Sequence, residues 1–168
     1  MKRSFCALIL LTALVFTLVG CGLMVERPKV KEGEFKFSVT YEINGETQTV
    51  SGVYVCEYDG IDRALDGVDH REWKGYIKDG TAEEQIKLAT AEDGGVVELN
   101  LHFAPEYFMG ESYGNDDEPF SPSITVRLED EEGLSFENDA DLIAKVYGAK
   151  IISYEYDEPI RNSFGVFN

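Results

Sequence analysis

The segment 104–122, APEYFMGESYGNDDEPFSP, holds the side chains of this chain that are best suited to binding chemistry. Aromatic faces stack on sugar rings or on partner side chains, and carboxylates accept hydrogen bonds from hydroxyl groups or bind cations. A segment of this length without a strand period is unusual in a compact domain and is often functional. The favoured interpretation is that the rings fold onto the core and the acids are solvated; the alternative is that the segment contacts a ligand or partner. The candidate contact residues are Tyr107, Phe108, Tyr113, Asp116 and Asp117.

A second acidic segment, YDGIDRALDGVDHRE at 58–72, raises the question of metal binding. Calcium needs six or more oxygen ligands that converge on one point. The EF-hand pattern fails, because taking Gly67 as its central glycine puts Trp73 where the bidentate glutamate belongs. A solvated acidic loop is the favoured interpretation, and a calcium site of another type is the alternative. Its ligands would include Asp59, Asp62, Asp66 and Asp69.

A third set of polar residues, Glu98, Asn100 and His102, shares one face of an expected strand. Two ligating groups and an amide are too few for a metal site, so a solvent-facing histidine is favoured. His70 lies in the acidic segment, and its position cannot be read from the sequence. Metal ligands are therefore left unassigned, and no cofactor is expected.

Catalytic signatures are absent from the sequence. It contains no G-x-S-x-G elbow, P-loop, dinucleotide glycine pattern, H-E-x-x-H or C-x-x-C. Carboxylates are so abundant that their presence does not identify a hydrolase. Cys56 falls on the apolar face of an expected strand and is interpreted as a small buried hydrophobe rather than a nucleophile. No catalytic residue is assigned, and an enzyme is not expected.

The N-terminal segment has the layout of a secretory signal, with Lys2 and Arg3 followed by an apolar run from 5 to 19. An uncleaved anchor helix is the alternative, because the run is long enough to span a bilayer. The run ends in Leu18-Val19-Gly20-Cys21, which resembles the lipobox of bacterial lipoproteins. The resemblance implies cleavage before Cys21, a diacylglycerol on its thiol, and a lipid-anchored protein on the extracytoplasmic side of the cell membrane.

The expected organisation is a signal peptide at 1–20, a lipidated N-terminus and tether at 21–33, and a single β-rich acidic domain at 34–168. The whole chain has a formal net charge of −17, and removing Lys2 and Arg3 with the leader makes it −19. Such a charge repels nucleic acid and anionic headgroups, so no nucleic-acid partner is expected. Expected partners are the membrane, through the lipid, and an envelope component or secreted protein. Cys56 alone remains after lipidation, which excludes an intrachain disulfide.

Strand periodicity is clearest from Phe35 to Ile43, where apolar and polar residues alternate before an Asn44-Gly45 turn. That hairpin sets Val39 opposite Val50 and Phe35 opposite Tyr54. A second hairpin is expected at Lys78–Thr81, with Trp73 opposite Ile86 and Ile77 opposite Ala82. Residues 85–90 are expected to form a strand, although Thr81–Glu84 also fits a helix capping box.

Further strands are expected at 96–103, 123–128 and 149–156, with another short one at 163–167. One helix is expected between an Asn138 N-cap and a Gly148 stop, and its buried stripe would be Leu142, Ile143 and Val146. This pattern predicts a mainly β fold: an antiparallel β-sandwich-like domain with one C-terminal helix. An α+β sheet with the helix packed on one face is the alternative.

The body of the chain also resembles uncharacterised small lipoproteins of Gram-positive bacteria, through YVCEYDGID, KIISYEYDEPI and the late helix. This resemblance implies no activity. We expect a membrane-anchored, non-catalytic binding or interaction module. The alternatives are a calcium-dependent structural or adhesion module and, less favoured, a carboxylate-based hydrolase.

Overall fold

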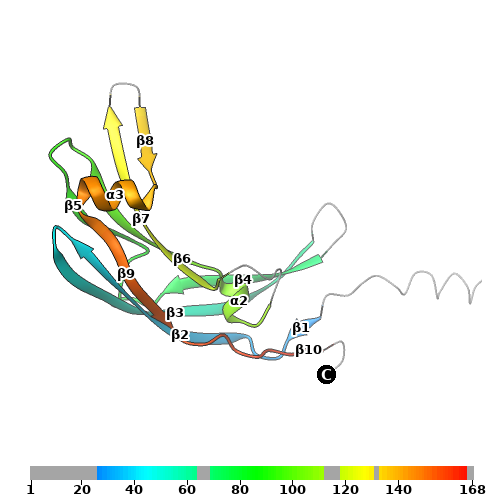
Figure 1. Cartoon of the computed structure of the whole chain (residues 1–168). Helices are drawn as coiled ribbons and strands as arrows, with labels where there is room; N and C mark the ends of the chain where they lie inside the picture. Colours follow the sequence, from blue (N-terminus) through cyan, green and yellow to red (C-terminus); the bar gives the residue numbers. More distant parts are fainter. Residues whose placement is uncertain (1–25, 64–68, 112–117, 131–132, 166–168) are drawn as a thin grey trace, which may run out of the picture.

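The computed structural model describes residues 26–63, 69–111, 118–130 and 133–165. This part of the chain is mainly β and forms two four-stranded antiparallel sheets, with strand orders β4-β3-β2-β9 and β5-β6-β7-β8, and a short β1-β10 pair (Figure 1). Large apolar side chains from both sheets meet in one core, so the predicted β-sandwich-like architecture with one C-terminal helix is confirmed. No helix among the described residues is long and apolar enough to cross a membrane.

The first sheet comprises β2 (Glu32–Ile43), β3 (Glu46–Arg63), β4 (Asp69–Ile77) and β9 (Ala149–Tyr156). The second comprises β5 (Gln85–Thr90), β6 (Val96–Phe103), β7 (Phe120–Asp130) and β8 (Gly133–Glu137). The remaining elements are β1 (Arg27–Pro28), α2 (Pro105–Phe108), α3 (Ala140–Tyr147) and β10 (Phe164–Gly165).

The β2–β3 hairpin has the predicted register. Ile43 lies opposite Glu46, Val39 opposite Val50 and Phe35 opposite Tyr54. Asn44 and Gly45 have φ values of 54° and 80°, as the two-residue turn of a tight hairpin requires. On the polar face, the hydroxyl oxygens of Thr40 and Thr49 lie 3.1 Å apart. The buried face carries Cys56, which is fully buried as predicted.

The acidic segment 58–72 was expected to be a solvated loop, and most of its described part is instead paired strand. β3 continues to Arg63, β4 begins at Asp69, and Asp62 pairs with His70. A register shift between Tyr58 and Gly60 bends the ladder without ending it. Continued pairing satisfies backbone groups that a loop would leave to water.

The second predicted hairpin is wrong, although a turn does form there. Thr81 donates from its N–H and its hydroxyl to the Lys78 carbonyl. Beyond that turn the chain leaves the first sheet: β4 pairs with β3, and β5 pairs with β6. Ile77, at the end of β4, and Ala82, in the connection before β5, therefore pack against a shared core instead of pairing across one hairpin. Residues 85–90 are a strand, as favoured over the capping-box helix.

Helix α3 starts one residue later than expected. The N-cap is Asp139, whose carboxylate accepts hydrogen bonds from the N–H groups of Asp141 and Leu142 at 3.0 Å each. Gly148 ends the helix with a φ of 61°, as predicted.

The predicted buried stripe of α3 is corrected. Ile143 is buried and Tyr147 packs partly against the core, whereas Leu142 and Val146 are 41% and 58% exposed. Successive helical residues are about 100° apart around the axis. When residues 143 and 147 face the core, residues 142 and 146 therefore lie on the side of the helix next to that face.

Candidate functional site

The segment 104–122 is anchored in the core at both of its described ends. Phe108 ends α2 and has no exposed surface. The centroid of its ring lies 4.6 Å from the centroid of the Phe35 ring. Phe120, which begins β7, is also fully buried. The favoured interpretation, in which the rings fold onto the core, therefore describes Phe108 and Phe120, and the candidate contact role of Phe108 is wrong because it presents no surface to a ligand. Tyr107 is half-buried.

Three of the expected contact residues, Tyr113, Asp116 and Asp117, lie outside the described residues. Cys21, the expected lipidation site, also lies outside them. The contact role of Tyr107, Tyr113, Asp116 and Asp117 stays a prediction.

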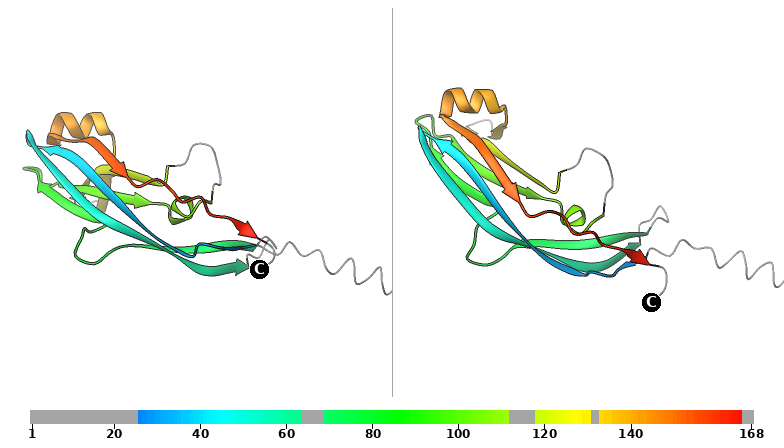
Figure 2. Two further views of the ribbon diagram at one scale, coloured as in Figure 1. Left: turned by 90° about the horizontal axis from the view of Figure 1, so that it is seen from below. Right: turned by 60° about the horizontal axis from the view of Figure 1, so that its bottom comes forward.

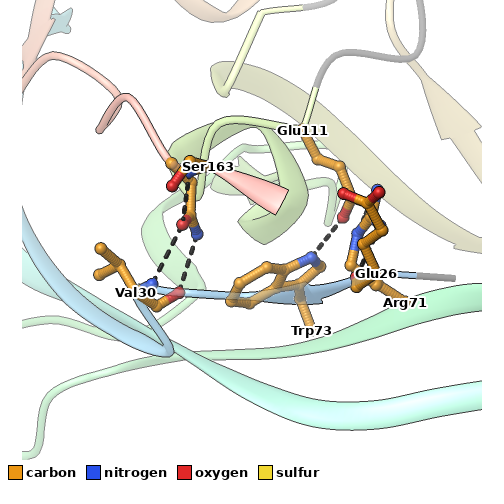
Figure 3. Close-up of polar contacts among 7 residues, drawn as sticks. Glu26, Val30, Arg71, Trp73, Glu111 and Ser163 are labelled. Carbon is orange, nitrogen blue, oxygen red and sulfur yellow. Dashed lines mark hydrogen bonds and ion pairs between the residues drawn. The ribbon is translucent and has the colours of Figure 1, made fainter. Parts of the chain in front are cut away.

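A buried carboxylate fixes the chain where the described part of this segment stops. Glu111 is 5% exposed and accepts hydrogen bonds from Arg71 Nε and Trp73 Nε1, both on β4 (Figure 3). We call Glu111, Arg71 and Trp73 the Glu111 clasp. Its carboxylate exchanges water for one guanidinium and one indole donor, which satisfies both of its oxygens.

Arg71 extends the clasp to both terminal segments. Its Nη1 donates to the Glu26 carbonyl at 2.9 Å, and its guanidinium lies 4.1 Å from the centroid of the Phe164 ring. The Asn162 side chain also pairs with the Val30 backbone, accepting at 3.0 Å and donating at 2.8 Å. One end of the molecule is thus held together by contacts between distant parts of the sequence.

A surface groove of 740 Å³ runs beside the clasp. It brings together Glu106 from α2 with Asp59 and His70 from the β3–β4 hairpin, which belong to two segments that are far apart in the sequence. Its other lining residues are Arg71, Glu72, Trp73 and Lys74. Despite this gathering of charges, no group of three or more His, Cys, Asp or Glu that could hold a metal ion occurs among the described residues. Asp66 lies outside them.

The predicted face of Glu98, Asn100 and His102 lies on the outer side of the second sheet. Glu98 is 6% exposed and accepts hydrogen bonds from Gln85 at 3.0 Å and Arg127 at 3.3 Å. Asn100 donates to the Thr125 hydroxyl at 2.9 Å. These contacts tie neighbouring strands together, while His102 is exposed.

Burial also determines the chemistry of the single described thiol. Cys56 has no exposed surface, and desolvation, with a smaller contribution from Glu106, raises its pKa to about 12. A thiol with such a pKa is protonated at neutral pH and is a poor nucleophile.

A group of exposed apolar side chains on three consecutive elements, β8, α3 and β9, was not predicted from the sequence. Eight large hydrophobic residues of the described chain are exposed, and six of them fall here. We call these six the distal apolar group: Leu134, Phe136, Leu142, Val146, Ile152 and Tyr154. Two features of the sequence indicated this group: apolar residues alternate in GLSFE at 133–137, and Leu142 and Val146 form an i, i+4 pair in α3. The i, i+4 pair was predicted to be buried in the core.

No protein-family model matches the chain, and no match was found among curated proteins or solved structures.

Proposed function

We propose that this protein is a lipid-anchored extracytoplasmic lipoprotein whose β-sandwich-like domain is a non-catalytic binding module. The proposed address is based on the leader and on Leu18–Cys21. Two acyl chains on Cys21 would hold the protein stably at a membrane, where a single chain would not. The domain would then begin close to the membrane, at β1.

The distal apolar group is the observation that carries the binding function. Most large apolar side chains of a folded domain are buried, and exposed ones concentrated on a few neighbouring elements are typical of interaction sites. β8 and α3 lie at the opposite end of the molecule from β1 and β10 (Figures 1 and 2). In the proposed orientation, this end projects away from the membrane and is accessible to a partner.

The buried ionisable groups support a non-catalytic role. Glu98 and Glu111 are the buried acids of the described chain, and each is neutralised by its own arginine. A catalytic acid or base must be able to reach a proton of the substrate. Both carboxylates are instead buried and occupied by hydrogen bonds within the fold, and the Cys56 thiol is held in its protonated form.

The address is tested by metabolic labelling with a fatty acid in cells that make the protein. The wild-type chain should take up label, and Cys21→Ala should not. Label that persists in Cys21→Ala would contradict the proposed attachment site.

The binding function is tested by co-purification after crosslinking in the same cells. Replacing Leu134, Phe136 and Val146 together by serine should abolish the crosslinked complexes, because all three side chains are more than half exposed. The matched control is Val30→Ser, at the other end of the molecule, where the side chain is 42% exposed. Complexes that survive the triple replacement, or that Val30→Ser abolishes to the same extent, would refute the assignment.

The predicted role of segment 104–122 needs a separate variant. Because Phe108 belongs to the core, the informative replacement is Tyr107→Ala with Tyr113→Ala, leaving Phe108 intact. Complexes lost in this variant would place contacts in the segment.

A further inference from the structure

The two sheets have four edge strands, and β8 lacks the features that protect the other three. Exposed edges are normally blunted by lysine, proline, bulges or a covering element. Exposed lysines lie on β4 (Lys74), β5 (Lys87) and β9 (Lys150). β5 and β9 also have register shifts against their neighbours. β8 reads GLSFE, without lysine or proline, and pairs with β7 in unbroken register.

The register shows which backbone groups β8 leaves unpaired. Asp130 lies opposite Gly133 across a two-residue connection, and Leu128 lies opposite Ser135. The pair that closes such a hairpin exchanges hydrogen bonds, and hydrogen-bonded pairs alternate with non-bonded pairs. The N–H and C=O groups of Leu134 and Phe136 therefore point away from β7, at the open edge.

The side chains of these residues add an apolar surface to that edge. Leu134 and Phe136 are two positions apart, so they lie on the same face of the strand. They are 56% and 59% exposed. The edge thus offers unpaired backbone groups together with two apolar contacts on one face.

Charge favours one kind of strand at this edge. β8 carries Glu137 and no base, and Arg127, which lies opposite Phe136 on β7, is already paired with Glu98. The whole chain has a net charge of −17, so a second copy would bring negative charge against negative charge. A strand that carries lysine or arginine between its apolar residues is complementary to both features.

We propose that β8 binds an extended basic segment of another polypeptide, with alternating apolar residues, as an added antiparallel strand. Backbone hydrogen bonds to Leu134 and Phe136 supply the pairing, and the alternate side chains supply the selectivity. This inference rests on the proposed binding function and specifies the partner's chemistry.

The test uses the full-length chain in phosphatidylcholine nanodiscs, whose zwitterionic lipid has little attraction for a cationic probe. The probe is a fluorescent peptide of alternating lysine and valine, seven residues long, with binding followed by fluorescence anisotropy and empty nanodiscs as the blank. In the proposed pairing, the valines lie on the face of Leu134 and Phe136, and their N–H groups point at β8. N-methylation of the valines should weaken binding by more than about tenfold, and N-methylation of the lysines by less than about threefold.

Further arms test the charge and the location. A peptide with glutamate in place of lysine should show no binding, and added salt should weaken the lysine peptide. Phe136→Ser should weaken binding by about tenfold or more, and Val30→Ser should leave it unchanged. Circular dichroism confirms that both variants keep the fold.

Three results would overturn the inference: equal weakening by the two N-methylated peptides, binding that Phe136→Ser leaves unchanged, or dimers in sedimentation that Phe136→Ser dissociates. If the peptides fail while the crosslinked complexes of the wild-type chain still depend on the distal apolar group, the strand-addition mode is refuted and the binding function stands. If the peptides fail and the complexes do not depend on that group, both are refuted.

Discussion

Replacing Glu111 by alanine should cost more stability than any exposed ion pair of this protein. Removing one partner of a buried ion pair typically costs about 3–5 kcal/mol, because the other charge is left uncompensated. Arg71 is 18% exposed and keeps its hydrogen bond to the Glu26 carbonyl, so the cost of leaving its charge uncompensated lies below that range. The Trp73 indole N–H loses its acceptor as well, at about 1–3 kcal/mol. We expect the free energy of unfolding to fall by about 3–4 kcal/mol.

Urea denaturation of the variants measures this cost. The matched control is Lys78→Met, which removes a salt bridge to Glu34 whose two side chains are each 51% exposed. An exposed pair of this kind is worth less than about 1 kcal/mol. Trp73→Phe, which removes the indole donor, should lie between the two variants. A loss for Glu111→Ala within about 1 kcal/mol of the Lys78→Met value would refute the reasoning about the clasp.

Three further predictions follow from burial and capping. In a background where Cys56 is the only thiol, it should resist a thiol reagent at pH 8 until urea unfolds the chain, and rapid labelling of the native protein at pH 8 would contradict this. Because burial raises the pKa of Cys56 from 9.0 to about 12, its contribution to the free energy of unfolding is complete below pH 9 and is lost as the pH rises toward 12. Asp139→Ala should cost about 1 kcal/mol in thermal unfolding while Asn138→Ala costs a few tenths, and the reverse order would restore the original cap assignment. Phe108→Ala should cost about 3–5 kcal/mol in urea and half-buried Tyr107→Ala distinctly less, whereas equal costs would show that Phe108 is not a core residue.

Local signals were sufficient to predict the β2–β3 hairpin residue by residue. Alternation assigns one face to the core, and the Asn44-Gly45 turn determines the pairing, so neither depends on distant parts of the chain. β6 and β9 were predicted with the correct ends for the same reason.

The errors arose where distant packing decides the structure. The turn at Lys78–Thr81 forms locally, but whether the next strand returns to the same sheet depends on the core that Ile77 and Ala82 share. In α3, Leu142 and Ile143 are equally apolar, and only the docking of the helix determines that Ile143 is buried.

The clasp could not be predicted from the sequence for a related reason. Glu111 lies 40 residues from Arg71 and 38 from Trp73, and nothing in the sequence distinguishes it from the many exposed acids of this chain. The distal apolar group was not predicted, because an apolar period in the sequence normally indicates a face that is buried within the domain. A face that a partner outside the chain covers gives the same pattern.

Photocrosslinking in cells that make the protein tests the binding function most directly. A photoreactive amino acid would replace Phe136 on β8 in one strain and Val30 near β1 in another; the native side chains at these positions are 59% and 42% exposed. We predict a discrete crosslinked protein species from position 136 and none from position 30. Absence of a crosslink from position 136, or the same products from both positions, would contradict the proposal that this end of the molecule binds a partner.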